Sequence, residues 1–174
     1  DDFWSNIGLS EIEIYGEESD IEAAENKNHV NAAGVTAEAS TTEASSLPVS
    51  NIKDGNNQTR WASDYSEASK QTVTVTFPKV TLVKELDFDL HTRDVAPMPS
   101  NVKSFDLVYA DAAGTEHTVK ISNAKSTESG KTGYVTNVQH IFETPVYMKS
   151  FKMTNFDLQI DIEGQNGYNN ISIL

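Results

Sequence analysis

The chain has 174 residues, a length that fits one domain with a hydrophobic core of its own. It contains no cysteine, which excludes disulfide bonds and cysteine-ligated zinc sites. Its net charge of −13 at pH 7 disfavours nucleic acid and anionic membrane surfaces as partners, whereas a neutral sugar or a calcium ion is compatible with it. No apolar run approaches the roughly 20 residues that span a bilayer, so we expect no membrane insertion.

The amino end, Asp1–Trp4, lacks the basic start and apolar core of a signal peptide. We therefore expect the chain to be an internal piece of a longer protein whose export signal lies elsewhere. Residues 7–16 alternate apolar and polar side chains and close with a glycine, which predicts a half-buried strand. Residues 17–28 are acidic and rich in Ala and Asn, and either a short helix or a surface loop fits them.

Strand patterns dominate the chain from Val30 onward. Residues 34–40 alternate small and polar side chains, and residues 71–78 form a strong strand pattern that we expect Pro78 to end. The remaining predicted strands cover residues 82–91, 104–109, 116–121, 140–142, 147–155 and 171–174. Short strands, turn-rich loops such as residues 111–114 and almost no helical periodicity predict an all-β, antiparallel β-sandwich.

The segment Lys53–Ser63, KDGNNQTRWAS, resembles the signature of the discoidin-like superfamily, which includes the coagulation-factor C-type domains and the family 32 carbohydrate-binding modules. In that family an Asp-Gly turn is followed by a polar stretch and then Thr-x-Trp, and Asp54, Thr59 and Trp61 agree with this spacing. Similar phrases follow in the family's order over most of the chain. The resemblance implies a discoidin-like jelly roll.

Relatives end with a strand similar to Ile-Ser-Leu-x-Glu-Ile-Glu-Val-Tyr, whereas this chain ends with Asn170–Leu174 and carries the matching phrase as Gly8–Gly16. Two explanations are open: the amino-terminal phrase is the tail of a preceding similar module, or it supplies the closing strand here. We favour the second, because Ile12 and Ile14 would stabilise the sandwich. The predicted organisation is one module over residues 1–174, with residues 1–29 an amino-terminal strand and linker.

The resemblance also implies a structural calcium ion in the Asp-Gly loop. Calcium accepts carboxylate, amide, hydroxyl and backbone oxygens together, and a tight turn can point several of these inward. The expected ligands are the backbone oxygen of Lys53, Asp54, Asn56, Thr59 and, from the closing strand, Glu11. The alternative is an Asx turn without metal, in which the Asp54 side chain bonds to its own backbone.

In family 32 modules an Arg and an Asn in one loop hold the hydroxyls of the sugar. Residues 92–101 match this loop, and Arg93 and Asn101 fall where that pair is expected. Two prolines stiffen the loop, which lowers the entropy cost of holding a ligand. The alternatives are that Arg93 forms a solvated pair with Asp94 and that Asn101 caps a turn.

The family's histidine, which follows the Trp in galactose-binding relatives, is replaced by Ala62. Asp64 and Tyr65 could replace its hydrogen bonds, and His91 could compensate or be an ordinary surface residue. Sugar sites also need a flat aromatic ring. The candidates for that ring are Tyr168, Phe156, Tyr65 and Trp4, whereas Trp61 is predicted to lie in the core.

The four histidines are scattered, and no catalytic motif occurs, so we expect the module to be non-catalytic. The resemblance implies a monomeric, extracellular carbohydrate-binding module within a larger bacterial protein. It would target a secreted glycoside hydrolase, such as an endo-N-acetylglucosaminidase, to galactose- or N-acetylhexosamine-containing animal glycans. The alternatives are a discoidin-type adhesion or protein-interaction domain and a structural spacer that has lost sugar binding.

Overall fold

The computed structural model describes residues 28–92, 100–126, 135–162, 165–166 and 171–174. The predicted strand over residues 7–16 and most of the segment that follows it therefore lie outside the described residues. Two short 3-10 helices, η1 (Val49–Lys53) and η2 (Ala68–Lys70), are the only helices in the described part of the chain. None of its helices has the length and apolarity that crossing a membrane requires.

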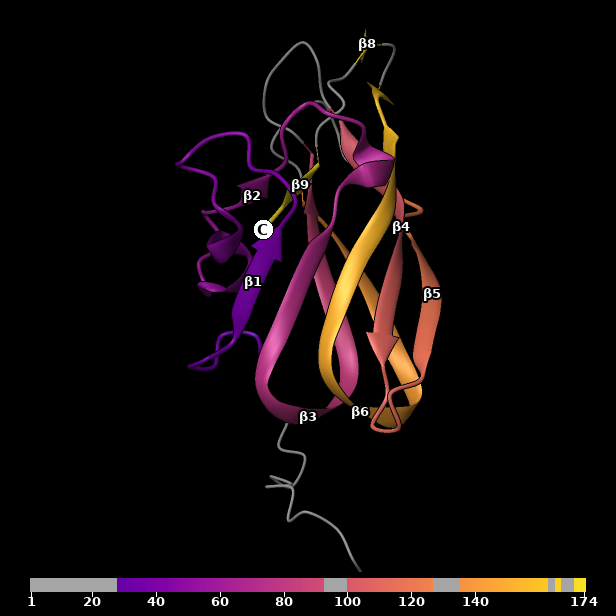
Figure 1. Ribbon diagram of the computed structural model, residues 1–174. Helices are drawn as coiled ribbons and strands as arrows, with labels where there is room; N and C mark the ends of the chain where they lie inside the picture. Colours follow the sequence, from indigo (N-terminus) through magenta and orange to yellow (C-terminus); the bar gives the residue numbers. More distant parts are fainter. Residues whose placement is uncertain (1–27, 93–99, 127–134, 163–164, 167–170) are drawn as a thin grey trace, which may run out of the picture.

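Strands form the body of the molecule (Figure 1). They are β1 (Thr36–Ala39), β2 (Trp61–Ala62), β3 (Val73–His91), β4 (Asn101–Ala110), β5 (Glu116–Ser122), β6 (Val135–Gln159), β7 (Asp161–Ile162), β8 (Gln165–Asn166) and β9 (Ser172–Ile173). The main sheet has the order β2-β9-β3-β6-β4-β5, with β1 also paired to β3, and β7 and β8 form a small separate ribbon. Every pairing is antiparallel.

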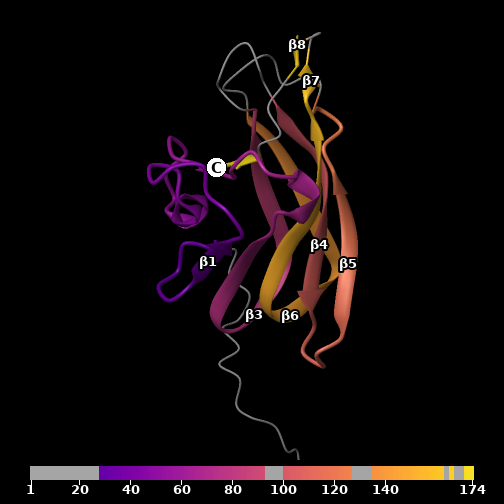
Figure 2. The same ribbon diagram turned by 45° about the horizontal axis from the view of Figure 1, so that its top comes forward.

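The two longest strands, β3 and β6, bend sharply at the lower end of the molecule and run back up (Figures 1 and 2). The first half of β3 pairs with β1 and with the second half of β6, which also pairs with β4. The second half of β3 pairs with the first half of β6 and, at Leu90, with β9. One hydrogen-bonded sheet is thereby folded into two layers, which confirms the predicted antiparallel β-sandwich.

The bends explain where the prediction of strand ends was wrong. β3 continues through Pro78 to His91, and residues 140–142 and 147–155 belong to the single strand β6. The β3–β6 register shifts between Thr76 and Thr81 and again between Val83 and Glu85. Proline lacks the N–H that a ladder needs but keeps an extended backbone, so Pro78 and Pro145 mark a break in pairing and not an end of the strand.

Aromatic side chains from the two layers meet in the core. Phe88, on the second half of β3, packs edge-on against Phe105 of β4 with ring centroids 5.0 Å apart. It also packs edge-on against Phe151 of β6 at 6.2 Å. Leu86, Phe88 and Leu90 are buried while Glu85, Asp87 and Asp89 are exposed, as their alternation predicts.

The two ends of the sandwich differ. The bends of β3 and β6 and the turn after β4 lie at one end, where Gly114 takes a φ of 81° and donates its amide to Asp111 O at 2.9 Å. At the other end β3 and β6 both begin and finish, β4 begins and β5 finishes. We call this second end, at the top of Figure 1, the loop end.

Candidate binding site at the loop end

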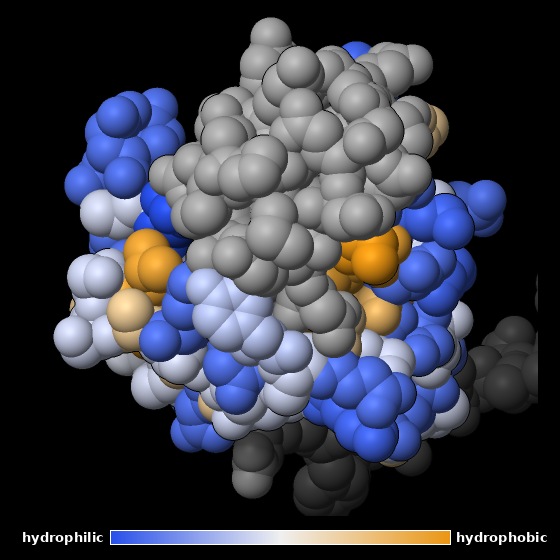
Figure 3. Space-filling model, turned by 90° about the horizontal axis from the view of Figure 1, so that it is seen from above, coloured by the Kyte–Doolittle hydropathy of each residue, from blue (hydrophilic) through white to orange (hydrophobic). Residues whose placement is uncertain are grey.

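The loop end gathers chain segments that are far apart in sequence. Ser63 donates its amide to Ile171 O at 3.0 Å, and Ile171 donates its amide to Ser63 Oγ at 3.0 Å. These bonds join the segment after β2 to the segment before β9. Viewed from this end, hydrophilic side chains predominate among the described residues around the rim (Figure 3).

A buried glutamine holds the segments before and after β2 together. Gln71 is 2% exposed, and its Oε1 accepts hydrogen bonds from Ser40 Oγ and Thr41 Oγ1, each at 2.6 Å. Its Nε2 donates to Ser66 Oγ at 2.5 Å and to Asp64 Oδ1 at 3.3 Å. A buried amide needs all its donors and acceptors paired, and Gln71 meets that need only with these segments in place.

Asp64 and Tyr65 are presented by this network. The Asp64 amide donates to Thr41 Oγ1 at 3.2 Å, and its carboxylate accepts from the Ser66 hydroxyl and from the Ser66 amide at 3.0 Å. The hydrogen bonds from Ser66, side chain first and then backbone, hold the pKa of Asp64 below its usual value. Tyr65 is 48% exposed, and its hydroxyl donates to Glu43 Oε1 at 2.5 Å, which fixes an aromatic ring at the surface.

His91 lies beside this cluster. It ends β3, is 7% exposed, and its Nδ1 lies 3.2 Å from Ser172 Oγ. Ser172 pairs in turn with Ala62, which is buried in β2. His91 is therefore a buried residue and not an ordinary surface residue.

Asn101 begins β4 in the other layer, opposite Gln159, and is 1% exposed. Asn123 connects the layers near it, because its Nδ2 donates to Val102 O at 3.0 Å and to Thr136 Oγ1 at 2.9 Å. The loop end thus holds Asn101 on one layer and His91, Asp64 and Tyr65 on the other. Arg93 and Tyr168 lie outside the described residues, so their ligand-binding roles stay predictions.

Among the candidates for the sugar-binding aromatic ring, the structure excludes Phe156 and retains Tyr65. Phe156 is 2% exposed and packs against Phe105 with centroids 5.5 Å apart, so it is a core residue and cannot offer a sugar-binding ring. Trp61 is fully buried, as predicted, and donates its indole N–H to Thr41 O at 3.1 Å. Trp4 lies outside the described residues, and Tyr65 is the candidate ring that is both described and exposed.

The predicted calcium loop lies beside the sandwich and closes on itself. Asp54 Oδ2 accepts from Thr59 Oγ1 at 2.8 Å, and that hydroxyl is also 2.8 Å from Asn56 O. Asp54 Oδ1 accepts a hydrogen bond from the Asn56 amide at 2.8 Å. This bond forms the Asx turn that was the alternative to a calcium site. Gly55 has a φ of 73°, and a Cβ there would lie 3.0 Å from Asn31 Nδ2, so the turn needs glycine.

The loop carries oxygen atoms of the kind that a hard cation takes as ligands, and in the closed turn these atoms bond to one another. A carboxylate, a hydroxyl and a carbonyl oxygen come together from Asp54, Thr59 and Asn56 within hydrogen-bonding distance, and calcium prefers such oxygen ligands. Lys53 ends η1 immediately before the loop. Glu11 lies outside the described residues. By sequence, Asp54 is the one carboxylate of the loop over residues 53–59. Within the described ranges, no group of three or more His, Cys, Asp or Glu side chains could hold a metal ion.

Comparison with known families agrees with this architecture. The sequence model of the F5/8 type C domain matches residues 36–173, from β1 to β9. The chain belongs to the F5/8 type C domain family. This confirms the resemblance to the discoidin and coagulation-factor C-type superfamily, and the matched range includes the Asp-Gly loop and Trp61. A search of curated proteins found no match.

Solved structures share the fold of this F5/8 type C domain at low identity. The family 32 CBM from C. perfringens NanJ in complex with galactose is 19% identical, with a TM-score of 0.53 over 80% of this chain and 92% of that chain. CBM32-1 from a family 31 glycoside hydrolase of Clostridium perfringens is 16% identical, with a TM-score of 0.54 over 81% and 90%. Chitosan-binding module 1 from a chitosanase/glucanase of Paenibacillus sp. IK-5 is 18% identical, with a TM-score of 0.51 over 84% and 95%.

Sequence reasoning missed two residues of this F5/8 type C domain site. Gln71 lies in the predicted strand over residues 71–78, and Glu43 lies in a segment to which no strand or site is assigned. No local pattern distinguishes either residue, because each forms its hydrogen bonds with residues distant in sequence. Glu43 bonds to Tyr65, and Gln71 bonds to Ser40 and Thr41.

The Ser66→Ala substitution should raise the pKa of Asp64 toward its ordinary value, because Ser66 supplies the largest lowering contribution. A lowered pKa stabilises the folded state above the unfolded pKa, and this stabilisation is lost as the pH falls through the folded pKa. The variant should therefore lose less stability on acidification than the wild type.

An NMR pH titration of the Asp64 carboxyl measures the change in its pKa. Ser69→Ala, which affects only the bond to Glu67, is the control, and an unchanged Asp64 pKa in Ser66→Ala would contradict the account.

Proposed function

We propose that this domain is a non-catalytic carbohydrate-binding module that binds galactose- or N-acetylhexosamine-containing glycans at its loop end. The observation that carries the proposal is the exposed Tyr65 ring, which is hydrogen-bonded to Glu43 and follows Asp64 in the same surface segment. A flat ring packs against the C–H face of a sugar, and adjacent polar groups bond to its hydroxyls. NanJ's module, which shares the fold, was solved with galactose.

Both layers of the sandwich contribute polar groups to the proposed site. Asp64 and His91 come from one layer and Asn101 from the other, and Arg93 belongs to the segment that joins His91 to Asn101. His91 and Asn101 are 7% and 1% exposed, so they would support the site from beneath, whereas Asp64 and Arg93 would bond to the sugar. His91, held beside Ser172, stands in for the histidine that Ala62 replaces. The preformed network around Gln71 limits the ordering that the ligand must impose, which favours binding.

The biological role that we propose is targeting. Single sugar sites bind weakly, and attachment to a larger enzyme raises the local concentration of substrate. Two of the modules with this fold come from a family 31 glycoside hydrolase and from a chitosanase/glucanase. We infer a secreted, extracellular bacterial glycoside hydrolase as the parent protein, an endo-N-acetylglucosaminidase acting on animal glycans being the specific candidate.

We further propose a structural calcium ion in the Asp54–Thr59 loop. The oxygens of Asp54, Asn56 and Thr59 would hold it, together with the Lys53 carbonyl and Glu11. The ion would tie the loop to the strand that contains Glu11 and would supply no chemistry to a ligand. Its binding would replace the Thr59–Asp54 hydrogen bond seen in the closed loop.

A glycan array tests the sugar site. Wild type should bind galactosides or N-acetylhexosaminides, and Tyr65→Ala and Arg93→Ala should each lose at least about fivefold in affinity, since stacking and polar contacts each contribute about 1 kcal/mol or more. Lys79→Ala is the control, because Lys79 is exposed at the bend of β3, and this variant should bind as wild type does. Binding that survives both loop-end substitutions would contradict the site, and absence of binding to every glycan would indicate a spacer.

Thermal unfolding tests the calcium ion. Calcium at about 100 times its Kd should stabilise the fold by about 2.7 kcal/mol, which raises Tm by about 5–10 °C for a domain of this size. Asp54→Asn should abolish most of this increase, because it removes the only carboxylate of the loop. Asn57→Ala changes an exposed neighbour outside the proposed ligands and should keep the increase. Equal calcium responses in the two variants would refute the site.

A further inference from the structure

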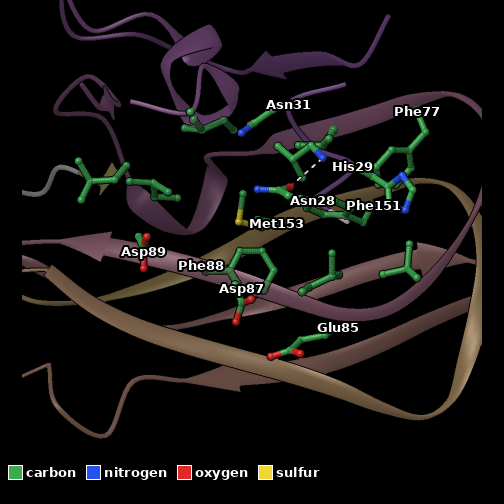
Figure 4. Close-up of a pocket in the computed structure, with 18 of the residues that line it drawn as sticks. Asn28, His29, Asn31, Phe77, Glu85, Asp87, Phe88, Asp89, Phe151 and Met153 are labelled. Carbon is green, nitrogen blue, oxygen red and sulfur yellow. Dashed lines mark hydrogen bonds between the residues drawn. The ribbon is translucent and has the colours of Figure 1, made fainter. Parts of the chain in front are cut away.

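Strand β5 forms an outer edge of the main sheet. It pairs with β4 along its whole length, from Glu116 to Ser122, and none of the described strands pairs with its other side. This edge is the right-hand margin of the molecule in Figures 1 and 2. The second half of β3 differs, because Asn28, His29 and Asn31 face it across a cavity (Figure 4). We call the free side of β5 the β5 edge.

The backbone of β5 alternates between groups that bond to β4 and groups that point away from it. The Asp111 amide donates to Thr115 O at 3.0 Å, and the Asn123 amide donates to Lys103 O at 2.8 Å. In an antiparallel pair every second residue bonds to the partner strand, so the odd-numbered residues of β5 bond to β4. The N–H and C=O groups of the even-numbered residues in Glu116–Ser122 therefore point outward. Such a row of groups is a template for one more strand.

The sequence of β5 allows further pairing. Exposed edges are commonly blocked by prolines, bulges or charged side chains. β5 contains neither proline nor glycine, and its register with β4 runs without a shift. Thr118, Val119 and Ile121 are β-branched, which favours an extended strand. Its acidic and basic side chains, Glu116 and Lys120, would oppose a strand that places like charges opposite them and favour one that places the opposite charge beside each.

We propose that the β5 edge binds the β5 edge of a second copy of this chain, antiparallel and with Thr118 on the two-fold axis. In this register Glu116 lies opposite Lys120 of the second copy, and symmetry repeats the pair on the other side of the axis. An axis at Val119 would place Lys120 opposite Thr118, and an axis at Lys120 would place two lysines opposite each other. The Thr118 register satisfies both charges and pairs the outward backbone groups in about six hydrogen bonds. This dimer differs from the monomer that the family resemblance implies.

Both faces of β5 fit this pairing. On the outer face Lys120 Nζ lies 3.3 Å from Asp106 Oδ1, and the ammonium group keeps donors for Glu116 of the second copy. On the inner face, the half-buried His117 would lie beside the half-buried Val119 of the second copy, so each would cover the other. Glu116 and Lys120 cancel in charge, so two neutral strips meet although each chain carries −13.

The contact is small, and its geometry separates it from the loop end. One strand pair buries little surface and the net charges repel, so we expect a Kd of roughly 0.1 mM at physiological salt. β5 finishes at the loop end, and antiparallel pairing therefore places the two loop ends at opposite ends of the dimer. A ligand at the loop end would leave the β5 edge free, so dimerisation does not depend on sugar binding.

Sedimentation equilibrium of the full chain tests the register by charge reversal. Wild type should dimerise as its concentration rises to about 1 mM, ten times the expected Kd. Glu116→Lys and Lys120→Glu should each weaken self-association at least about tenfold, because like charges then meet on both sides of the axis. An equimolar mixture of these two variants should associate about as well as wild type, since each lysine again meets a glutamate.

Glu38→Lys is the control, because it makes the same charge change at an exposed position on β1, and it should not weaken dimerisation. A wild type that stays monomeric at 1 mM would overturn the proposal. A mixture that associates no better than the single variants would overturn it as well.

The absence of cysteine allows a direct test of the axis by cross-linking. Directly opposed residues in a hydrogen-bonded antiparallel pair have Cα atoms about 5.5 Å apart, a distance that a disulfide spans. Thr118→Cys, treated with oxidised glutathione, should therefore form a disulfide-linked dimer at least ten times faster than Ser122→Cys. In this register the two copies of residue 122 lie about 27 Å apart. Equal rates in the two variants would overturn the proposal, whatever the outcome of sugar binding.

Discussion

The hydrogen-bonded ladder between β3 and β6 is the constraint on which the rest of the structure depends. Both strands pass through both layers. Strands β1, β9 and β4 pair directly with one of them, and β2 and β5 are attached through β9 and β4. Because each strand bends near a proline at one end, both strands begin and finish at the other end. The pair thereby collects the loops at a single end of the sandwich.

Local polar networks then give the loop end a definite shape. Gln71 lies two residues before the start of β3, and its buried amide needs partners from the segments around residues 40 and 65. The same segments carry Tyr65 and Asp64 to the surface. The Asp-Gly loop is a separate unit of the same kind, in which Asp54 organises a short polar turn beside the sandwich. The strands thus form a rigid frame, and short polar segments shape the surface of the loop end.

Much of this could be predicted from the sequence. Period-two alternation identified the core face of β3 at Leu86, Phe88 and Leu90, and the Asp-Gly to Thr-x-Trp phrase identified the family and the buried position of Trp61. The continuity of β3 through Pro78 was not predictable, because a proline that ends a strand and one that bends it have the same local sequence. The core position of Phe156 and the burial of His91 depend on contacts between layers that strand alternation alone does not define.

Under the proposed function, sugar binds at the loop end and not at the bend end. The most direct measurement is an amide NMR titration of the full chain with a galactoside or N-acetylhexosaminide. Chemical-shift changes should concentrate at residues 63–66, 71, 91 and 101, and residues 78–81 and 111–114 should be unaffected. Shifts centred on the bend end, or no shifts with any sugar of these two classes at millimolar concentration, would contradict it.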